Sequence, residues 1–164
     1  MKNNFKALLL HLIIVAISVI FVILFVVTGP KFGQYTTHII SKLFISIGFI
    51  LIYIFSGTLL DINTNKKFDF LVDSFIAIAG IALWCYTISI TETSLLEITK
   101  GIPEELSEYW ILMNIYHTPL FFIKFLFGLP NTPFMSLITN LFPSLLMGLG
   151  LKYKRLKSIK NSTV

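Results

Sequence analysis

Residues Ala7 to Thr28 form a run of 22 amino acids without lysine, arginine, aspartate or glutamate. As an α-helix, such a run rises about 33 Å, which exceeds the roughly 30 Å of a bilayer's hydrocarbon core. A secretory signal peptide has a shorter apolar core and ends at a site of small residues, whereas this run ends at Val27-Thr28-Gly29-Pro30. The sequence therefore predicts an uncleaved first transmembrane helix.

Three further apolar segments reach the length of a membrane crossing, at residues 43–60, 71–90 and 134–151. Small residues in the first two of these segments permit close contact between helices; they are Gly48, Ser56, Gly57, Thr58, Ser74, Ala77 and Gly80. Only 13% of the 164 residues are charged, about half the share typical of soluble domains. We therefore expect residues 1–164 to form a single all-α integral membrane domain, a bundle of four transmembrane helices with spans at about 7–28, 43–60, 71–90 and 134–151.

The segment 109–129 is long enough to cross a bilayer, but it carries polar side chains. On a helix, Asn114, His117 and Lys124 fall within about 120° of one another and form a polar stripe. Pro119 removes one backbone hydrogen bond and predicts a kink. We therefore expect a kinked helix that is re-entrant or lies at the membrane interface, and the alternative is a fifth span.

Basic residues follow the last apolar segment directly and indicate a cytoplasmic C-terminus, because lysine and arginine near a span resist translocation; they are Lys152, Lys154, Arg155, Lys157 and Lys160. With four crossings, the N-terminus is cytoplasmic too, and nine of the 13 lysines and arginines lie inside. With five crossings, eight of the 13 lie inside. The difference of one charge favours four crossings of a cell membrane, with the acidic segment 91–108 outside.

Three aspartates, Asp61, Asp69 and Asp73, surround the connection between the second and third spans. Asp69 and Asp73 are four residues apart and share one face of a helix, so the group is a candidate site for a metal cation or for proton transfer. The alternative is that they stabilise a helix start through its dipole, with Lys66 and Lys67 as counter-ions. We favour this structural role, because carboxylates cost little at the end of a span.

Other features exclude several classes of protein. The glycine-rich motifs of nucleotide-binding proteins and the G-x-S-x-G motif of serine hydrolases are missing. His11, His38 and His117 are dispersed without metal-ligand spacing, and the single Cys85 rules out an internal disulfide. The basic residues stand at the ends of apolar segments and form no stripe for nucleic acid. We therefore expect the lipid bilayer as partner and no cofactor. The bias toward Phe, Ile, Lys and Asn resembles that of proteins from AT-rich bacterial genomes.

Three classes of function are compatible with this sequence. The sequence contains no recognisable catalytic group of residues. It therefore favours a non-enzymatic protein that acts through a membrane-protein partner or as a homo-oligomer, such as an accessory subunit, a regulator or an immunity-type protein. The alternative is a small transporter, or the membrane subunit of one, that uses the polar stripe of residues 109–129. The third is a metal-dependent membrane enzyme that acts on a lipid-linked substrate through the three aspartates.

Overall fold

The computed structural model describes residues 2–62, 69–70, 73–92 and 104–162, and these ranges contain helices and connections but no strand. The elements are α1 (Lys2–Thr37), α2 (Ile39–Thr58), α3 (Ser74–Thr91), the 3-10 helix η2 (Glu104–Trp110), α4 (Ile111–Tyr116), α5 (Thr118–Leu126), α6 (Pro133–Thr139) and α7 (Phe142–Ser162). Four helical stretches are long and apolar enough to cross a membrane: Lys2–Gly29, Ile39–Thr58, Ser74–Thr91 and Pro133–Asn161. The prediction of an all-α chain with four such helices is confirmed.

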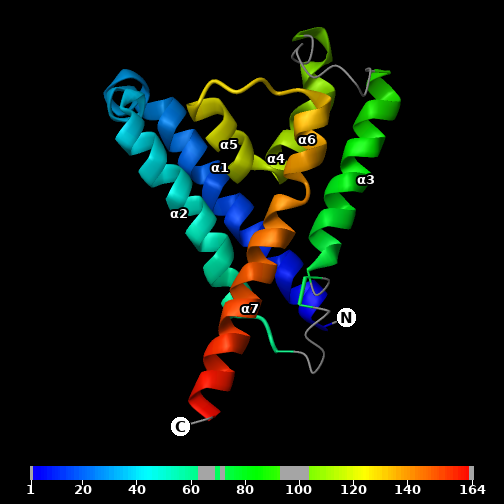
Figure 1. Ribbon diagram of the computed structural model, residues 1–164. Coiled ribbons are helices and arrows are strands. Elements are labelled where there is room, and N and C mark those ends of the chain that lie inside the picture. The colour runs from blue at the N-terminus through cyan, green and yellow to red at the C-terminus, as the bar shows by residue number, and fades with distance from the viewer. Residues whose placement is uncertain (1, 63–68, 71–72, 93–103, 163–164) are drawn as a thin grey trace.

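The chain runs back and forth between two ends of an elongated bundle (Figure 1). Both termini lie at one end, the basal end, near which Arg155 is found; the opposite, distal end carries Glu92 and Phe127. α1 runs from the basal to the distal end, α2 returns, and α3 runs to the distal end again. α6 and α7 together return the chain to the basal end.

A break at Gly29 divides α1. Gly29 has φ 50° and ψ −127°, a backbone conformation that glycine adopts without strain, and the helix then resumes as far as Thr37. His38 is extended (φ −70°, ψ 131°), and α2 begins at the next residue. The helix resumes after the break because the proline that follows Gly29 in the sequence suits the first turn of a new helix.

The segment 109–129, which the sequence predicts to be one kinked helix, contains two helices that we call the inner hairpin, α4 and α5. α4 runs from the distal end into the bundle and stops before His117, and α5 runs back to the distal end (Figure 1). His117 leaves helical geometry (φ −104°, ψ 20°). Pro119 lies in the first turn of α5, where its missing N–H sacrifices no hydrogen bond. It therefore starts a second helix instead of kinking the first.

The last apolar segment, residues 134–151, is also divided. Thr132 caps α6, and its hydroxyl accepts a hydrogen bond from Met135 N at 3.2 Å. α6 then ends before Asn140, and α7 begins two residues later. Pro143 lies in the first turn of α7 and has no N–H to continue the helix from α6. The result is a helix break inside the bundle.

Close packing of α2 against α7 depends on two glycines. A Cβ atom at Gly57 would overlap the backbone of Met147, and one at Gly150 would overlap the carbonyl group of Ile54. Small residues allow this approach of two backbones. Gly48, which the sequence placed in the same category as Gly57, has no atom within 4 Å of its Cβ position and contributes no such contact.

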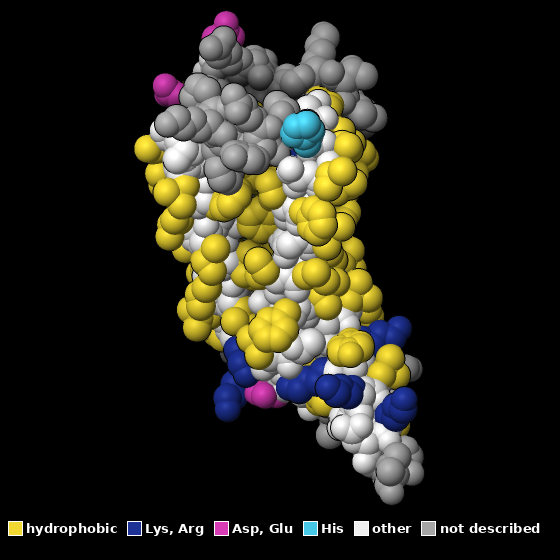
Figure 2. Space-filling model, turned by 90° about the vertical axis from the view of Figure 1, so that its left-hand side faces the viewer, with side chains coloured by type: hydrophobic (Ala, Val, Ile, Leu, Met, Phe, Trp, Pro, Cys, Tyr) yellow, Lys and Arg dark blue, Asp and Glu magenta, His cyan; other side chains and the backbone are white. Residues whose placement is uncertain are grey.

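Between the two ends, the face of the molecule shown in Figure 2 carries a broad belt of hydrophobic side chains. Lysine and arginine side chains gather at the basal end, below this hydrophobic belt. Large apolar side chains are widely exposed around the bundle, among them Val26, Val27, Ile40, Phe44, Phe55, Ile78, Leu112 and Phe125. Soluble monomeric proteins rarely expose apolar surface on this scale.

Candidate functional site

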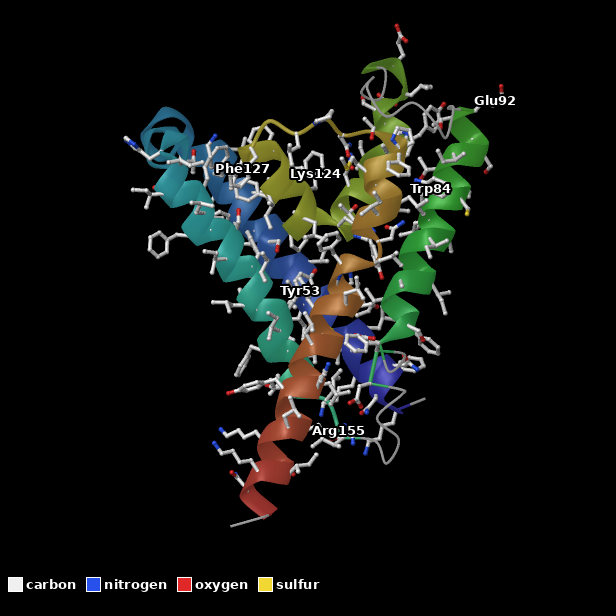
Figure 3. All side chains as sticks on the ribbon, viewed as in Figure 1. Tyr53, Trp84, Glu92, Lys124, Phe127 and Arg155 are labelled. Carbon is white, nitrogen blue, oxygen red and sulfur yellow. The ribbon has the colours of Figure 1, made fainter. Side chains whose placement is uncertain are left out.

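Five side chains meet inside the bundle, where the tip of the inner hairpin approaches the break between α6 and α7. They are His11 from α1, Tyr53 from α2, Tyr116 and His117 from the hairpin tip, and Asn140. We call them the central polar site. His11 and Asn140 are fully buried, and only 4% of His117 is exposed. Figure 3 shows Tyr53 in the interior, between the two ends of the bundle.

Hydrogen bonds and ring contacts hold this site together. His11 Nδ1 and the Tyr53 hydroxyl are hydrogen-bonded at 3.1 Å, and the Tyr116 hydroxyl donates to the carbonyl of Ile76 at 2.9 Å. The ring centroid of His11 lies 4.6 Å from that of Tyr116 and 6.4 Å from that of His117. Residues from α1, α2, α3 and the inner hairpin thus converge on one buried point.

Several polar atoms of the central polar site make no hydrogen bond of good geometry among the described residues: both ring nitrogens of His117, His11 Nε2, and both polar atoms of the Asn140 carboxamide. The Asn140 and His117 side chains nevertheless lie close enough to interact with each other. Gly80 allows both to approach α3 closely, because a Cβ atom there would lie 2.9 Å from Asn140 Oδ1 and 3.1 Å from His117 Nε2. Buried polar groups are normally paired, and each unpaired one costs about 1–3 kcal/mol. This arrangement is suited to a small polar ligand that supplies the missing partners.

A second polar group, the distal polar network, lies nearer the distal end and consists of Asn114, Lys124, Asn131 and Ser136. Lys124 Nζ donates to Asn131 Oδ1 at 2.9 Å, and Ser136 Oγ donates to the same oxygen at 3.2 Å. Asn131 Nδ2 donates to Asn114 Oδ1 at 3.3 Å. Figure 3 shows Lys124 on the distal part of the bundle. Of the stripe predicted from the sequence, Asn114 and Lys124 meet in this network, whereas His117 belongs to the central polar site.

Sequence reasoning missed six residues of these two groups as site residues: His11, Tyr53, Tyr116, Asn131, Ser136 and Asn140. Asn131 stands in Pro130-Asn131-Thr132-Pro133, which is typical of a turn, and no local signal indicates that its side chain reaches Lys124. The sequence did contain a signal for His11, because it is an ionisable residue within a long apolar helix. Asn140 lies at the break before Pro143, and its place in the site depends on the hairpin tip, which is distant from it in the sequence.

A groove of about 270 Å³ lies between α1 and the inner hairpin. Its walls are mainly apolar, and Asn114 and Thr118 provide its polar lining. Asn114 therefore belongs both to the groove and to the distal polar network. This shared residue connects the network with the surface of the bundle.

The three aspartates considered as a cation site lie in three different environments. Asp69 forms a bidentate pair with Arg155, whose Nε donates to Oδ2 at 2.7 Å and whose Nη2 donates to Oδ1. Asp61 is exposed, and its Oδ1 lies 3.8 Å from Lys6 Nζ. Asp73 is buried, without a hydrogen-bond partner for its carboxylate in the described part of the chain. Within the described ranges, no three His, Cys, Asp or Glu residues are placed to hold a metal ion.

Asp73 immediately precedes α3, where a helix-stabilising carboxylate is expected, but its side chain makes no capping hydrogen bond. Ser144 Oγ donates to its backbone carbonyl at 2.8 Å. Burial raises the pKa of the Asp73 carboxyl to about 7. Lys66 and Lys67, which the sequence suggested as counter-ions, lie outside the described residues.

No protein family, curated protein or solved structure matches this chain. Its own geometry is therefore the basis on which a function is assigned.

Proposed function

We propose that the chain is a multi-pass protein of the cell membrane that crosses the bilayer four times, with the inner hairpin as a re-entrant element. The hydrophobic belt and the four long apolar helices support this arrangement. The basal end faces the cytoplasm in this proposal, because it carries most of the lysines and arginines near span ends; in the described residues these are Lys2, Lys6, Lys152, Lys154, Arg155, Lys157 and Lys160.

Within this membrane domain, the protein binds and transports a small polar solute at the central polar site. The observation that carries this proposal is the unused hydrogen-bonding capacity of His11, His117 and Asn140 where two interrupted helices meet. Unpaired polar groups are costly in a membrane interior. Interrupted helices at membrane depth are tolerated where they are buried in protein or line a water-filled cavity, and they form the binding sites of many transporters. A transient ligand accounts for both features.

The geometry supports transport better than the other two classes of function. A protein that acts only through a partner at its surface needs no unpaired polar groups at its centre. A metal-dependent enzyme needs its carboxylates together, whereas Asp69 and Asp61 pair with separate cations. We therefore place transport ahead of the partner-dependent function that the sequence favoured.

The test is whether a water-soluble reagent reaches the central polar site. In a Cys85→Ser background, Asn140→Cys is treated with uncharged 2-hydroxyethyl methanethiosulfonate, which reacts with thiolates where water permits ionisation. We expect Asn140→Cys to react at least about tenfold faster than a cysteine in contact with lipid. Gly48→Cys is the lipid-facing control, because nothing lies within 4 Å of its Cβ position. Ser107→Cys, on the exposed surface of η2, is the positive control.

A reactive Ser107→Cys combined with an Asn140→Cys that reacts as slowly as Gly48→Cys would mean that no solute reaches the site. That result would overturn the transport proposal and leave action through a protein partner as the better explanation. Thermal unfolding of each variant in mild detergent checks that the substitution has not unfolded the protein.

A further inference from the structure

Lys124 is a buried cation in the part of the bundle nearest the distal end. Only 9% of the residue is exposed, and its ammonium group donates one hydrogen bond, to the neutral amide oxygen of Asn131. A lysine ammonium has three N–H donors. In the described part of the chain, two of its N–H donors therefore have no acceptor, and its positive charge has no opposite charge beside it.

The ionisable groups around Lys124 do not include an acid in the described residues. The ionisable groups that act on His117 are His11 and Lys124, both of them bases. The described carboxylates lie elsewhere: Glu92, Glu105 and Glu108 are exposed, Asp61 is exposed beside Lys6, Asp69 is bound to Arg155, and Asp73 lies beside α7 near Ser144. Burial is the only influence resolved on the Lys124 ammonium. The remaining ionisable side chains at the central polar site are the hydroxyls of Tyr53 and Tyr116. The central polar site and the distal polar network thus carry basic groups without a carboxylate from the described residues to balance them.

A buried charge of this kind requires compensation. Desolvating an ammonium group costs several kcal/mol even after the protein relaxes, and at membrane depth ionisable residues normally pair or mark a substrate path. Asn131 supplies a dipole but no opposite charge. A mobile anion would supply both the missing charge and the missing acceptors.

We infer that the transported solute is a small anion and that Lys124 binds it first. This inference rests on the proposed transport function and adds the substrate class to it. Lys124 lies seven residues beyond His117 on the arm that returns to the distal end, which corresponds to about 10 Å of helix. An anion that enters from the distal side meets the Lys124 ammonium, and Asn140 and the two histidines then receive it.

The experiment compares two thiol reagents of similar size and opposite charge at Asn140→Cys in the Cys85→Ser background. They are the sulfonatoethyl and trimethylammonioethyl methanethiosulfonates, applied to intact cells. Each rate is divided by the rate of the same reagent with a small thiol in solution. We expect the anionic reagent to be favoured at least about tenfold, because opposite charges attract strongly where little water screens them.

Charge-matched variants assign this preference to Lys124. Lys124→Met should reduce the ratio of the two rates toward one, and Lys124→Arg, which keeps the charge, should preserve it. Lys152→Met removes the same charge from an exposed position at the basal end and should leave the ratio unchanged. The variant with arginine keeps the test valid if the protein with methionine does not fold.

Protection then identifies the anion. Sodium chloride, sodium acetate and sodium phosphate are compared at equal ionic strength, so that general screening is constant. The transported class of anion should slow modification of Asn140→Cys at least severalfold, and Lys124→Met should abolish this protection. Equal rates in all three salts would count against binding of any of these anions.

The failures of the two proposals are distinguishable. If neither charged reagent nor the uncharged one reacts, the site is closed and transport itself fails. If the uncharged reagent reacts and the cationic reagent is favoured over the anionic one, access stands and the anion inference is overturned. A preference for the anionic reagent that survives in Lys124→Met would also overturn it, because Lys124 would then not be the group that selects charge.

Discussion

The ion pair between Asp69 and Arg155 shows how one side chain can hold two distant parts of the chain together at the basal end. The two residues are 86 positions apart in the sequence, and both are largely buried. Two parallel hydrogen bonds give the pair a defined orientation. They attach the end of α7 to the connection between α2 and α3.

We predict that Asp69→Asn lowers the thermal unfolding midpoint of the protein in mild detergent, because Arg155 then loses its charged acceptor. Asp61→Asn is the matched control. The Asp61 side chain is 61% exposed, and this change should alter the unfolding free energy by less than about 0.5 kcal/mol. Equal effects of the two substitutions would contradict a structural role for the buried pair.

At the same scale, the sequence indicates what a residue does locally but not which distant residue it meets. Thr132 is recognisable as a helix cap because Pro133 follows it and the signal spans two adjacent positions. Asp69 was considered with Asp73 because four residues separate them on an assumed helix. The structure begins α3 only at Ser74, so Asp69 lies before the helix and is free to bind Arg155.

At the scale of elements, the contact between α2 and α7 depends on the absence of side chains. Gly57 and Gly150 face the partner backbone directly. A methyl group at either position has no flexible neighbour to displace. Replacing either glycine by alanine should therefore weaken the contact between α2 and α7, whereas the same replacement at an exposed position of a helix would be tolerated.

We predict that Gly57→Ala destabilises the protein by about 1–3 kcal/mol through overlap with the backbone of Met147. Gly48→Ala, in the same helix but with open space around its Cβ position, should be neutral or stabilising by up to about 1 kcal/mol. Thermal unfolding of both variants in the same detergent gives the comparison. A larger loss for Gly48→Ala than for Gly57→Ala would refute the close helix contact.

The long apolar helices were predictable because hydrophobicity over about 20 residues is itself the physical requirement. The inner hairpin was not predictable in the same way. Pro119 is compatible with a kinked helix and with the first turn of a new one, and local propensity does not decide between them. Tertiary contacts decide between them, since α4 contacts α3 and α1 while α5 contacts α1 and α2.

At the scale of the whole molecule, the path of the chain places both termini at one end. Because both termini lie at one end, this path is compatible with four crossings of a membrane and incompatible with five. The expected position of each connection relative to a membrane then follows from the proposed cytoplasmic basal end. Reporter cysteines on described, exposed residues test this arrangement directly.

We predict that, in Cys85→Ser cells, a membrane-impermeant maleimide labels Glu105→Cys and does not label Ile62→Cys. Glu105 lies in η2 at the distal end, and Ile62 follows α2 at the basal end. Labelling of Ile62→Cys after the membrane is permeabilised is the control for reactivity. The reverse pattern in intact cells would indicate five crossings and an external N-terminus.

The depth of the central polar site has an electrical consequence. His11 lies five residues beyond Lys6 on α1, which corresponds to only about 7–8 Å of helix. In the proposed membrane arrangement, most of the membrane thickness therefore separates the site from the distal side, and an anion that arrives from there would cross most of the transmembrane voltage before it is bound. One elementary charge that crosses the full field gains or loses about 2.3 kcal/mol per 100 mV. The basal end faces the cytoplasm in this proposal, and the cytoplasm is at a negative potential. Hyperpolarisation would therefore release the anion from the site, and depolarisation would favour its binding.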